Sequence, residues 1–306
     1  MHRKSLHKAI QKESDVKGRY LILVSILIVV LLSGLGFLAY RSLCVPERET
    51  ITFVFHPGES MELGVLKENF GPIFVALSAK LDMDYDVKLG SSYAATMESL
   101  RNGTADVSRI GSSMYVLTRD EIDFRLVAWD IMDGEDHYHA VLLGRPGIWE
   151  EPFTFEQLRG KTVAFVDPSS TSGYIAPMTA MLDAGVALED LGKYSFGTTH
   201  PVAIEAMLNG VADVACTGDA MIPEIEDSGS LEGEDFIVLW ESPPLVMDVW
   251  VIGPGVGTEK ADRIAEALLN LPDEVFEGCW IDGFSPVDLS AYEFSEKMLR
   301  AVGEIE

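Results

Sequence analysis

The chain of 306 residues contains only three cysteines, Cys44, Cys216 and Cys279, and no CxxC pair. Cys216 falls in an apolar strand pattern and Cys279 stands beside Trp280, so we expect buried thiols rather than a disulfide or a metal site. The six histidines show no spacing typical of metal ligands. The sequence therefore predicts neither a metal ion nor another cofactor.

Basic residues are scarce after the first 44 positions. Residues 1–44 hold seven of the 23 basic and two of the 49 acidic residues, which leaves 16 basic and 47 acidic side chains and a charge of about −31. Such a surface excludes nucleic-acid binding through a basic patch, and an anionic ligand would need a strong local site. The acidity fits a halophilic protein or an ordinary acidic surface, and composition leaves both open.

Patterns typical of catalysis are also missing. The chain has no nucleophile elbow and no Cys and His of recognisable spacing, so an enzyme would have to use isolated Ser, His and Asp residues. We therefore expect a binding protein rather than an enzyme.

One long uncharged run stands near the N-terminus, from Tyr20 to Tyr40. A helix of this length, at about 1.5 Å per residue, spans a hydrocarbon core of about 30 Å. Six basic residues precede the run, so the positive-inside tendency predicts a cytoplasmic tail at 1–19 and an extracytoplasmic chain after a linker at 41–50.

A cleaved signal peptide is the alternative reading of the run at 20–40. The run is longer than the usual apolar region of a signal peptide, and no small-x-small cleavage site follows it. Cys44 is preceded by Arg41-Ser42-Leu43, which lacks the residues of a lipobox, so lipidation is not expected. We expect an uncleaved, single-pass membrane helix.

A repeated stretch indicates that the remainder has two related halves. Residues 93–107 (YAATMESLRNGTADV) recur 107 positions later as residues 200–214 (HPVAIEAMLNGVADV), with matches that extend to Gly218 and Met221. Each copy predicts an amphipathic helix that Asn-Gly ends, then a short strand and a glycine turn. Chance similarity between such units is the alternative, but the match continues through a loop, which favours duplication and two α/β lobes.

The pattern of strands and helices assigns 51–140 and 246–306 to lobe one and 141–245 to lobe two. Predicted strands include 51–55, 86–89, 125–130 and 139–144, and predicted helices include 66–81, 174–184, 261–269 and 294–302. The extended run at 245–253 would carry the chain back to lobe one. Two crossings between the lobes would form a hinge beside a cleft.

The sharpest local signal is the hydroxyl-rich loop Ser169-Ser170-Thr171-Ser172-Gly173 before a predicted helix. Its hydroxyls and backbone N–H groups suit an oxyanion at the helix N-terminus. One N-cap would explain a single hydroxyl, but the loop has four. No lysine follows Gly173, so this is not a Walker loop. His200 also begins a helix and is a candidate donor to the same oxyanion.

Two tyrosines and two acids are candidates for the other end of such a ligand. Asp219 and Asp248 lie in otherwise apolar surroundings, and either could hold a cationic group. Tyr93 or Tyr138 would supply an aromatic face. Acidic residues are abundant here, so position alone distinguishes these two.

From about Thr50 to Val302 the chain resembles the phosphonate- and phosphite-binding proteins of ABC importers. The resemblance rests on four segments: 158–174 (LRGKTVAFVDPSSTSGY), His200 with 203–213, 242–248 (SPPLVMD) and 281–286 (IDGFSP). It implies a type II periplasmic-binding-protein fold, in which two α/β lobes close on a ligand.

The resemblance also implies roles for individual residues. Ser170, Thr171, Ser172 and His200 would hold the phosphonate oxygens. The two tyrosines and two acids that surround the organic end in aminophosphonate binders match Tyr93, Tyr138, Asp219 and Asp248. The loop Phe55-His56-Pro57-Gly58 departs from the apolar-Pro pattern of the family, so that wall of the cleft is expected to differ.

The sequence thus predicts a membrane-anchored, extracytoplasmic receptor that passes a phosphorus oxyanion to an ABC permease and its ATPase. A sensory module that signals through the single helix is one alternative, but a tail of about twenty residues would need a signalling partner. An enzyme that acts on a phosphorylated metabolite is the other.

Overall fold

The computed structural model describes Val30 and residues 48–58, 62–223 and 236–306. The chain divides into two units, Met1–Glu49 and Thr50–Glu306, and the second contains both sheets. The predicted membrane span at 20–40 lies, except for Val30, outside the described residues. Within the described ranges no helix has the length and apolar character needed to cross a membrane.

The first lobe, as we use the term, is a six-stranded sheet with its helices, in the order β13-β4-β12-β3-β1-β2. Its strands are β1 (Thr50–Phe55), β2 (Asp84–Leu89), β3 (Val107–Ile110), β4 (Arg125–Ile131), β12 (Val249–Ile252) and β13 (Gly283–Ser285). Its helices are α2 (Leu63–Leu81), α3 (Tyr93–Arg101), α4 (Ser112–Thr118), α8 (Thr258–Leu269) and α9 (Tyr292–Ala301).

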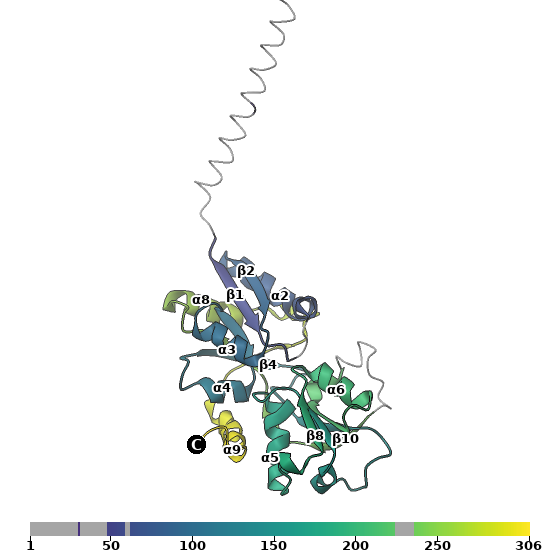
Figure 1. Ribbon diagram of the computed structural model, residues 1–306. Helices are drawn as coiled ribbons and strands as arrows, with labels where there is room; N and C mark the ends of the chain where they lie inside the picture. The colour runs from purple at the N-terminus through teal and green to yellow at the C-terminus, as the bar shows by residue number, and fades with distance from the viewer. Residues whose placement is uncertain (1–29, 31–47, 59–61, 224–235) are drawn as a thin grey trace, which may run out of the picture. The chain divides into compact units, whose positions relative to one another are not determined.

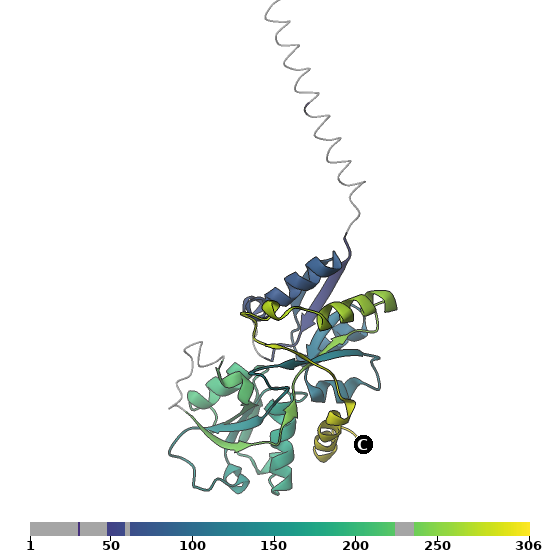
Figure 2. The same cartoon turned by 180° about the vertical axis from the view of Figure 1, so that it is seen from behind.

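The second lobe is a five-stranded sheet with its helices, in the order β10-β6-β9-β7-β8. Its strands are β6 (Ala140–Gly144), β7 (Thr162–Phe165), β8 (Lys193–Phe196), β9 (Val214–Gly218) and β10 (Ile237–Glu241). Its helices are α5 (Ala176–Asp183), which a π-helical turn at Thr171–Ile175 precedes, and α6 (His200–Leu208). Figures 1 and 2 show the lobes from opposite sides.

The two sheets share one topology. In each sheet the second strand from one edge, β1 or β7, lies between two parallel partners. The inner partner, β3 or β9, then pairs with an antiparallel strand, β12 or β6. The chain supplies β6 after leaving the first lobe and β12 after leaving the second. Each sheet therefore contains a strand that the chain forms just after it crosses from the other lobe. The chain passes between the two sheets twice.

The two connections contain short strands that pair with each other, β5 (His137–Tyr138) and β11 (Leu245–Val246). This antiparallel ribbon fits the position of a hinge, because a few residues there can absorb a change in the angle between lobes. The exact lobe limits expected from the sequence stay a prediction, since Thr50–Glu306 forms one compact unit.

The sequence repeat corresponds to one structural unit built twice. Helices α3 and α6 have nine residues each, and Gly103 and Gly210 after them have φ values of 73° and 72°. Directly before the strands that follow, Asp106 Oδ2 accepts the Thr52 N–H at 2.9 Å, and Asp213 Oδ2 accepts the Thr162 N–H at 2.8 Å. The prediction of the same helix and strand in both lobes is therefore confirmed.

Three local predictions need correction. Helix α2 begins at Leu63 and strand β2 at Asp84, both earlier than expected. The helix predicted at 174–184 begins as a π-helical turn at Thr171, because Ser170 already caps it. The extended run at 245–253 is interrupted between β11 and β12, where the carbonyl of Asp248 accepts the N–H of Asp130 at 3.1 Å.

Helix α9 ends the chain and contacts helices of both lobes. It packs against α4 of the first lobe and α5 of the second (Figure 1). The Thr179 hydroxyl of α5 donates to the Met298 carbonyl at 3.3 Å, and the Ser295 hydroxyl donates to Ser112 Oγ at 2.9 Å. The sequence placed this segment on lobe one, whereas the helix contacts both lobes.

Candidate functional site

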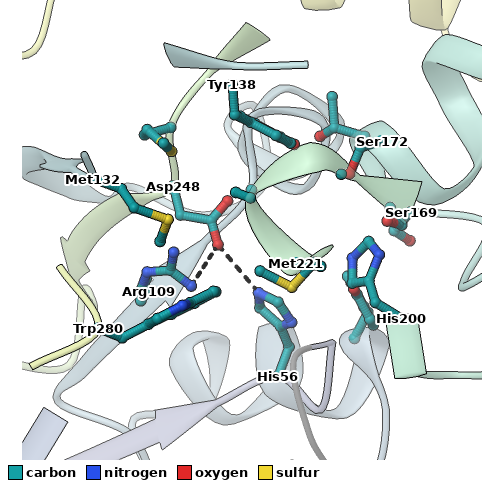
Figure 3. Close-up of a pocket in the computed structure, with 17 residues that line it drawn as sticks. His56, Arg109, Met132, Tyr138, Ser169, Ser172, His200, Met221, Asp248 and Trp280 are labelled. Atoms are coloured by element: carbon teal, nitrogen blue, oxygen red, sulfur yellow. Dashed lines mark ion pairs between the residues drawn. The ribbon is translucent and has the colours of Figure 1, made fainter. Parts of the chain in front are cut away.

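A cavity that is partly open to solvent lies where the two lobes meet. Both lobes and the segments that connect them contribute to its walls (Figure 3). Seven of the eight predicted site residues line it: Tyr93, Tyr138, Ser170, Thr171, Ser172, His200 and Asp248.

The hydroxyl-rich loop forms one wall, after strand β7. Ser170 Oγ accepts the Gly173 N–H at 3.1 Å, so this single hydroxyl performs the N-cap role. Thr171 Oγ1 instead accepts the Ser113 N–H of the first lobe at 3.0 Å, and Ser172 is hydrogen-bonded to Tyr138. The other hydroxyls thus exceed what one cap requires, as the sequence indicated, and all three side chains are buried.

His200 faces the same cavity from the first turn of α6. Thr199 caps that helix, and the buried His200 ring places Nδ1 2.8 Å from Thr217 Oγ1. The His200 backbone N–H donates to the Gly58 carbonyl of the first lobe at 2.8 Å. The ring is therefore held at Nδ1 and the backbone at its N–H, and the side chain lines the cavity.

The two tyrosines lie on different elements. Tyr93, the first residue of α3, stacks on His56 with ring centroids 4.4 Å apart. Tyr138 belongs to the hinge strand β5, and a Cβ on Gly218 would lie only 3.0 Å from its ring. Burial and the nearby Asp248 carboxylate raise the pKa of Tyr138, so it remains a neutral hydroxyl.

Asp248 lies in the break between β11 and β12, and its carboxylate forms an ion pair with Arg109 and contacts His56. Asp248 Oδ2 is 2.9 Å from Arg109 Nη1 and 3.5 Å from His56 Nε2 (Figure 3). Burial alone would raise the pKa of Asp248, but the Arg109 guanidinium and the His56 ring outweigh it and lower the pKa to about 2. The side chain is therefore an anion at neutral pH.

Arg109 is held by a second carboxylate on its far side. Arg109 Nε donates to Asp130 Oδ2, and Trp250 Nε1 donates to Asp130 Oδ1 at 2.8 Å. Asp130 is fully buried, and this burial raises its pKa to about 6 although Arg109 opposes the shift. Arg109 thus bridges two acids and is 3 % exposed.

His56 has a defined proton. The Gly58 N–H donates to His56 Nδ1 at 3.1 Å, so Nδ1 is an acceptor and the ring proton is assigned to Nε2. That proton points to Asp248. His56 thus contributes to this wall of the cavity, and the expected difference of the loop at 55–58 from the family pattern stays a prediction.

Asp219 does not line this cavity. Its Oδ1 accepts the N–H groups of His139 and Ala220, at 2.9 and 2.8 Å. The residue lines an adjacent pocket together with Asp133, Glu135 and His137. Four residues are shared by both pockets: Met132, Tyr138, Ala220 and Met247. The structure therefore brings together the other seven candidates but not this one.

Sequence reasoning missed three residues that shape the cavity, His56, Arg109 and Trp280. The Arg109 guanidinium carbon lies 5.2 Å from the centre of the Trp280 ring. An arginine inside the apolar strand pattern 107–110 was the signal that could have revealed it, because a buried cation needs a buried partner.

The arrangement suits binding of a small oxyanion by neutral donors. The hydroxyls of Ser170, Thr171 and Ser172 and the ring of His200 line one wall, from the starts of two helices. Within the described part of the chain, no three His, Cys, Asp or Glu side chains are arranged to hold a metal ion.

Comparison with known proteins gives a consistent result. The model of the family described as "ABC transporter, phosphonate, periplasmic substrate-binding protein" matches residues 53–292. A phosphate-import protein PhnD of Mycolicibacterium smegmatis is 25% identical over 228 residues, which cover 71% of this chain and 70% of that protein.

Two solved structures share the fold. A binding protein of an ABC phosphonate transporter from Pseudomonas aeruginosa has a TM-score of 0.75 at 17% identity and covers 84% of this chain and 88% of its own. PhnD1 of Prochlorococcus marinus, in complex with methylphosphonate, has a TM-score of 0.73 at 18% identity, with coverages of 84% and 99%. The predicted periplasmic-binding-protein fold is confirmed.

Proposed function

Because the chain belongs to the family of periplasmic substrate-binding proteins of phosphonate ABC transporters, we propose that its cavity binds a phosphonate or a related phosphorus oxyanion. Membership makes the protein a solute-binding component of an importer and not an enzyme. A permease and an ATPase are therefore its partners, and the binding unit works outside the cytoplasm. The proposal concerns the ligand and the residues that hold it.

The observation that carries the proposal is the convergence of second-lobe donors, from the starts of two helices, on one buried wall. Ser170, Thr171 and Ser172 supply hydroxyls at the start of one helix, and His200 supplies its ring from the start of the other. Fixed donors in a partly dehydrated site favour an oxyanion without a lysine. Tyr93 and Asp248 then face the substituent from the first lobe.

We further propose that residues 20–40 anchor the protein in the membrane as a single helix, with 1–19 in the cytoplasm. The support is the uncharged run and the basic residues before it. An anchored receptor would deliver its ligand to a neighbouring permease without free diffusion.

Thermal unfolding of the full chain in a mild detergent tests the ligand. Phosphate, phosphite, methylphosphonate and sulfate would each be added in separate samples. A ligand at 100 times its dissociation constant adds about 2.7 kcal/mol of stability, a shift of a few degrees. Stabilisation by phosphorus compounds but not by sulfate supports the proposal, and no response from a folded protein contradicts it.

Extraction of membranes with alkaline carbonate tests the anchor separately. The full chain should stay in the membrane pellet, and a chain without residues 1–44 should not. Release of the full chain would contradict the anchor, and a mature protein that lacks these residues by mass would mean that the segment is a cleaved signal peptide.

A further inference from the structure

We infer that Arg109 is a permanent ion-pair partner of Asp248 and occupies the place that a cationic ligand group would take. The cavity therefore selects phosphorus oxyanions whose substituent carries no positive charge. The inference rests on the proposed function and names the substrate class of the same site. A hydrogen, methyl or other uncharged alkyl group would be accepted, and an aminoalkyl group would be disfavoured.

The first step is that Asp248 is already paired. Its Oδ2 lies 2.9 Å from Arg109 Nη1 and 3.5 Å from His56 Nε2, and the side chain is 15 % exposed. A ligand ammonium that approached this carboxylate would also approach the guanidinium. Two cations on one carboxylate repel each other, and the repulsion is strong in a partly buried site.

The second step is that Arg109 cannot move aside. Its Nε is bonded to Asp130, whose side chain is fully buried and also accepts from Trp250. Its guanidinium carbon also lies over the rings of Phe70 and Trp280, 5.5 and 5.2 Å from their centroids. Withdrawal would leave a buried carboxylate without its cation, which is strongly unfavourable.

The third step is that the described walls of the cavity offer no second carboxylate to replace Asp248. Among the described lining residues Asp248 is the single carboxylate. Asp219, the second acid expected to hold an amine, lines the adjacent pocket, where its Oδ1 accepts the His139 and Ala220 N–H groups. An ammonium on the ligand would therefore be desolvated without a dedicated anion.

The fourth step concerns the walls around the substituent. Three methionines, Met132, Met221 and Met247, line the cavity together with Trp280 and Ala220. These side chains offer dispersion contacts to a methyl or propyl group and no hydrogen bond to an ammonium. The Arg109–Asp248 ion pair and the apolar lining of the cavity thus both favour a ligand with an uncharged substituent.

The test compares two ligands of equal shape, n-propylphosphonate and 2-aminoethylphosphonate, which differ in a terminal methyl or ammonium. Calorimetric titration of the full chain in detergent should give at least tenfold tighter binding of the propyl compound. Equal or tighter binding of the amine would overturn the inference and leave the proposed function intact. No binding of any phosphorus compound by a folded protein would overturn both.

A variant identifies Arg109 as the cause. Arg109→Met combined with Asp130→Asn removes the cation together with its buried partner, so no charged group is left unpaired behind Asp248. The preference for propyl over aminoethyl should fall at least tenfold, and Asp248→Asn added to the pair should abolish that change. An unchanged preference in the folded double variant would overturn the inference. If the variant does not fold, the wild-type ratio still decides.

Discussion

Thr171 Oγ1 of the second lobe accepts a hydrogen bond of 3.0 Å from the backbone N–H of Ser113 in the first lobe. Ser112 Oγ lies 3.3 Å from the same oxygen and in turn accepts from Ser295 of α9. A residue of the hydroxyl-rich loop is thus tied directly to the helix that faces it. The described structure therefore has the lobes in contact at the cavity.

Thr171→Val should favour a more open protein. The change leaves the buried Ser113 N–H without its acceptor in the closed arrangement, which costs about 1–3 kcal/mol. X-ray scattering from the ligand-free protein should show a larger radius of gyration than wild type. Thr104→Val, at an exposed position, serves as the control and should leave the radius unchanged. A wild-type radius in Thr171→Val would mean that this contact does not hold the lobes.

Ser172→Ala and His200→Ala should each weaken binding of methylphosphonate at least tenfold, or about 1.4 kcal/mol. Each change removes a buried donor from the wall proposed to hold the oxyanion. Calorimetric titration measures the effect, and the exposed Ser290→Ala should bind as wild type does. Unchanged affinity in both site variants would refute the assignment of this wall.

Asp213→Ala should destabilise the second lobe by about 1.5–3 kcal/mol, because a carboxylate then no longer accepts the Thr162 N–H at 2.8 Å. Asp106→Ala should have a similar effect through Thr52 in the first lobe. Urea unfolding gives both values. The exposed Asp120→Ala should change stability by less than about 0.5 kcal/mol. Small effects at both repeat positions would show that these bonds contribute little.

Because of Asp130, the free energy of unfolding should decrease as the pH rises from about 4 to about 6. Burial raises its pKa from the ordinary 3.8 to about 6, so the folded state binds a proton that the unfolded state has lost in this window. The contribution to the slope is at most about 1.4 kcal/mol per pH unit. Asp130→Asn should remove this contribution.

Denaturant unfolding at a series of pH values measures the difference between Asp130→Asn and wild type. Other carboxylates cancel in that difference, so only its slope is informative. Asp248, whose pKa lies at about 2, contributes in the opposite sense below pH 4, where stability falls as the pH falls. A difference that does not vary between pH 4 and 6 would contradict the raised pKa of Asp130.

Local signals in the chain were sufficient to predict one helix and one strand in each lobe and the hydroxyl-rich loop of the second. The repeat predicted α3 with β3 and α6 with β9, because Asn-Gly ends a helix and the Asp that follows bonds a neighbouring strand. The loop at 169–173 was recognised from its excess of hydroxyls. These features depend on residues close together in the sequence, and such interactions are readable without a tertiary structure.

The course of the chain between the lobes was harder to read in detail. The run at 245–253 is apolar enough for one strand, yet it forms β11 in the hinge ribbon and β12 in the first sheet. Its interruption at Asp248 depends on the carbonyl contact with Asp130 and on two different partner strands. No pattern within the run itself encodes these partners.

The sequence by itself determined the family, the paired α/β units and the hydroxyl-rich wall, because each depends on local patterns or on a repeat. Only the tertiary structure placed Asp219 in the adjacent pocket and brought Arg109 between Asp130 and Asp248. The net charge of the part of the cavity that would face the ligand's substituent depends on these side chains, which come from segments far apart in the sequence. Only packing and burial decide which of them meet, so the sequence alone does not give that charge.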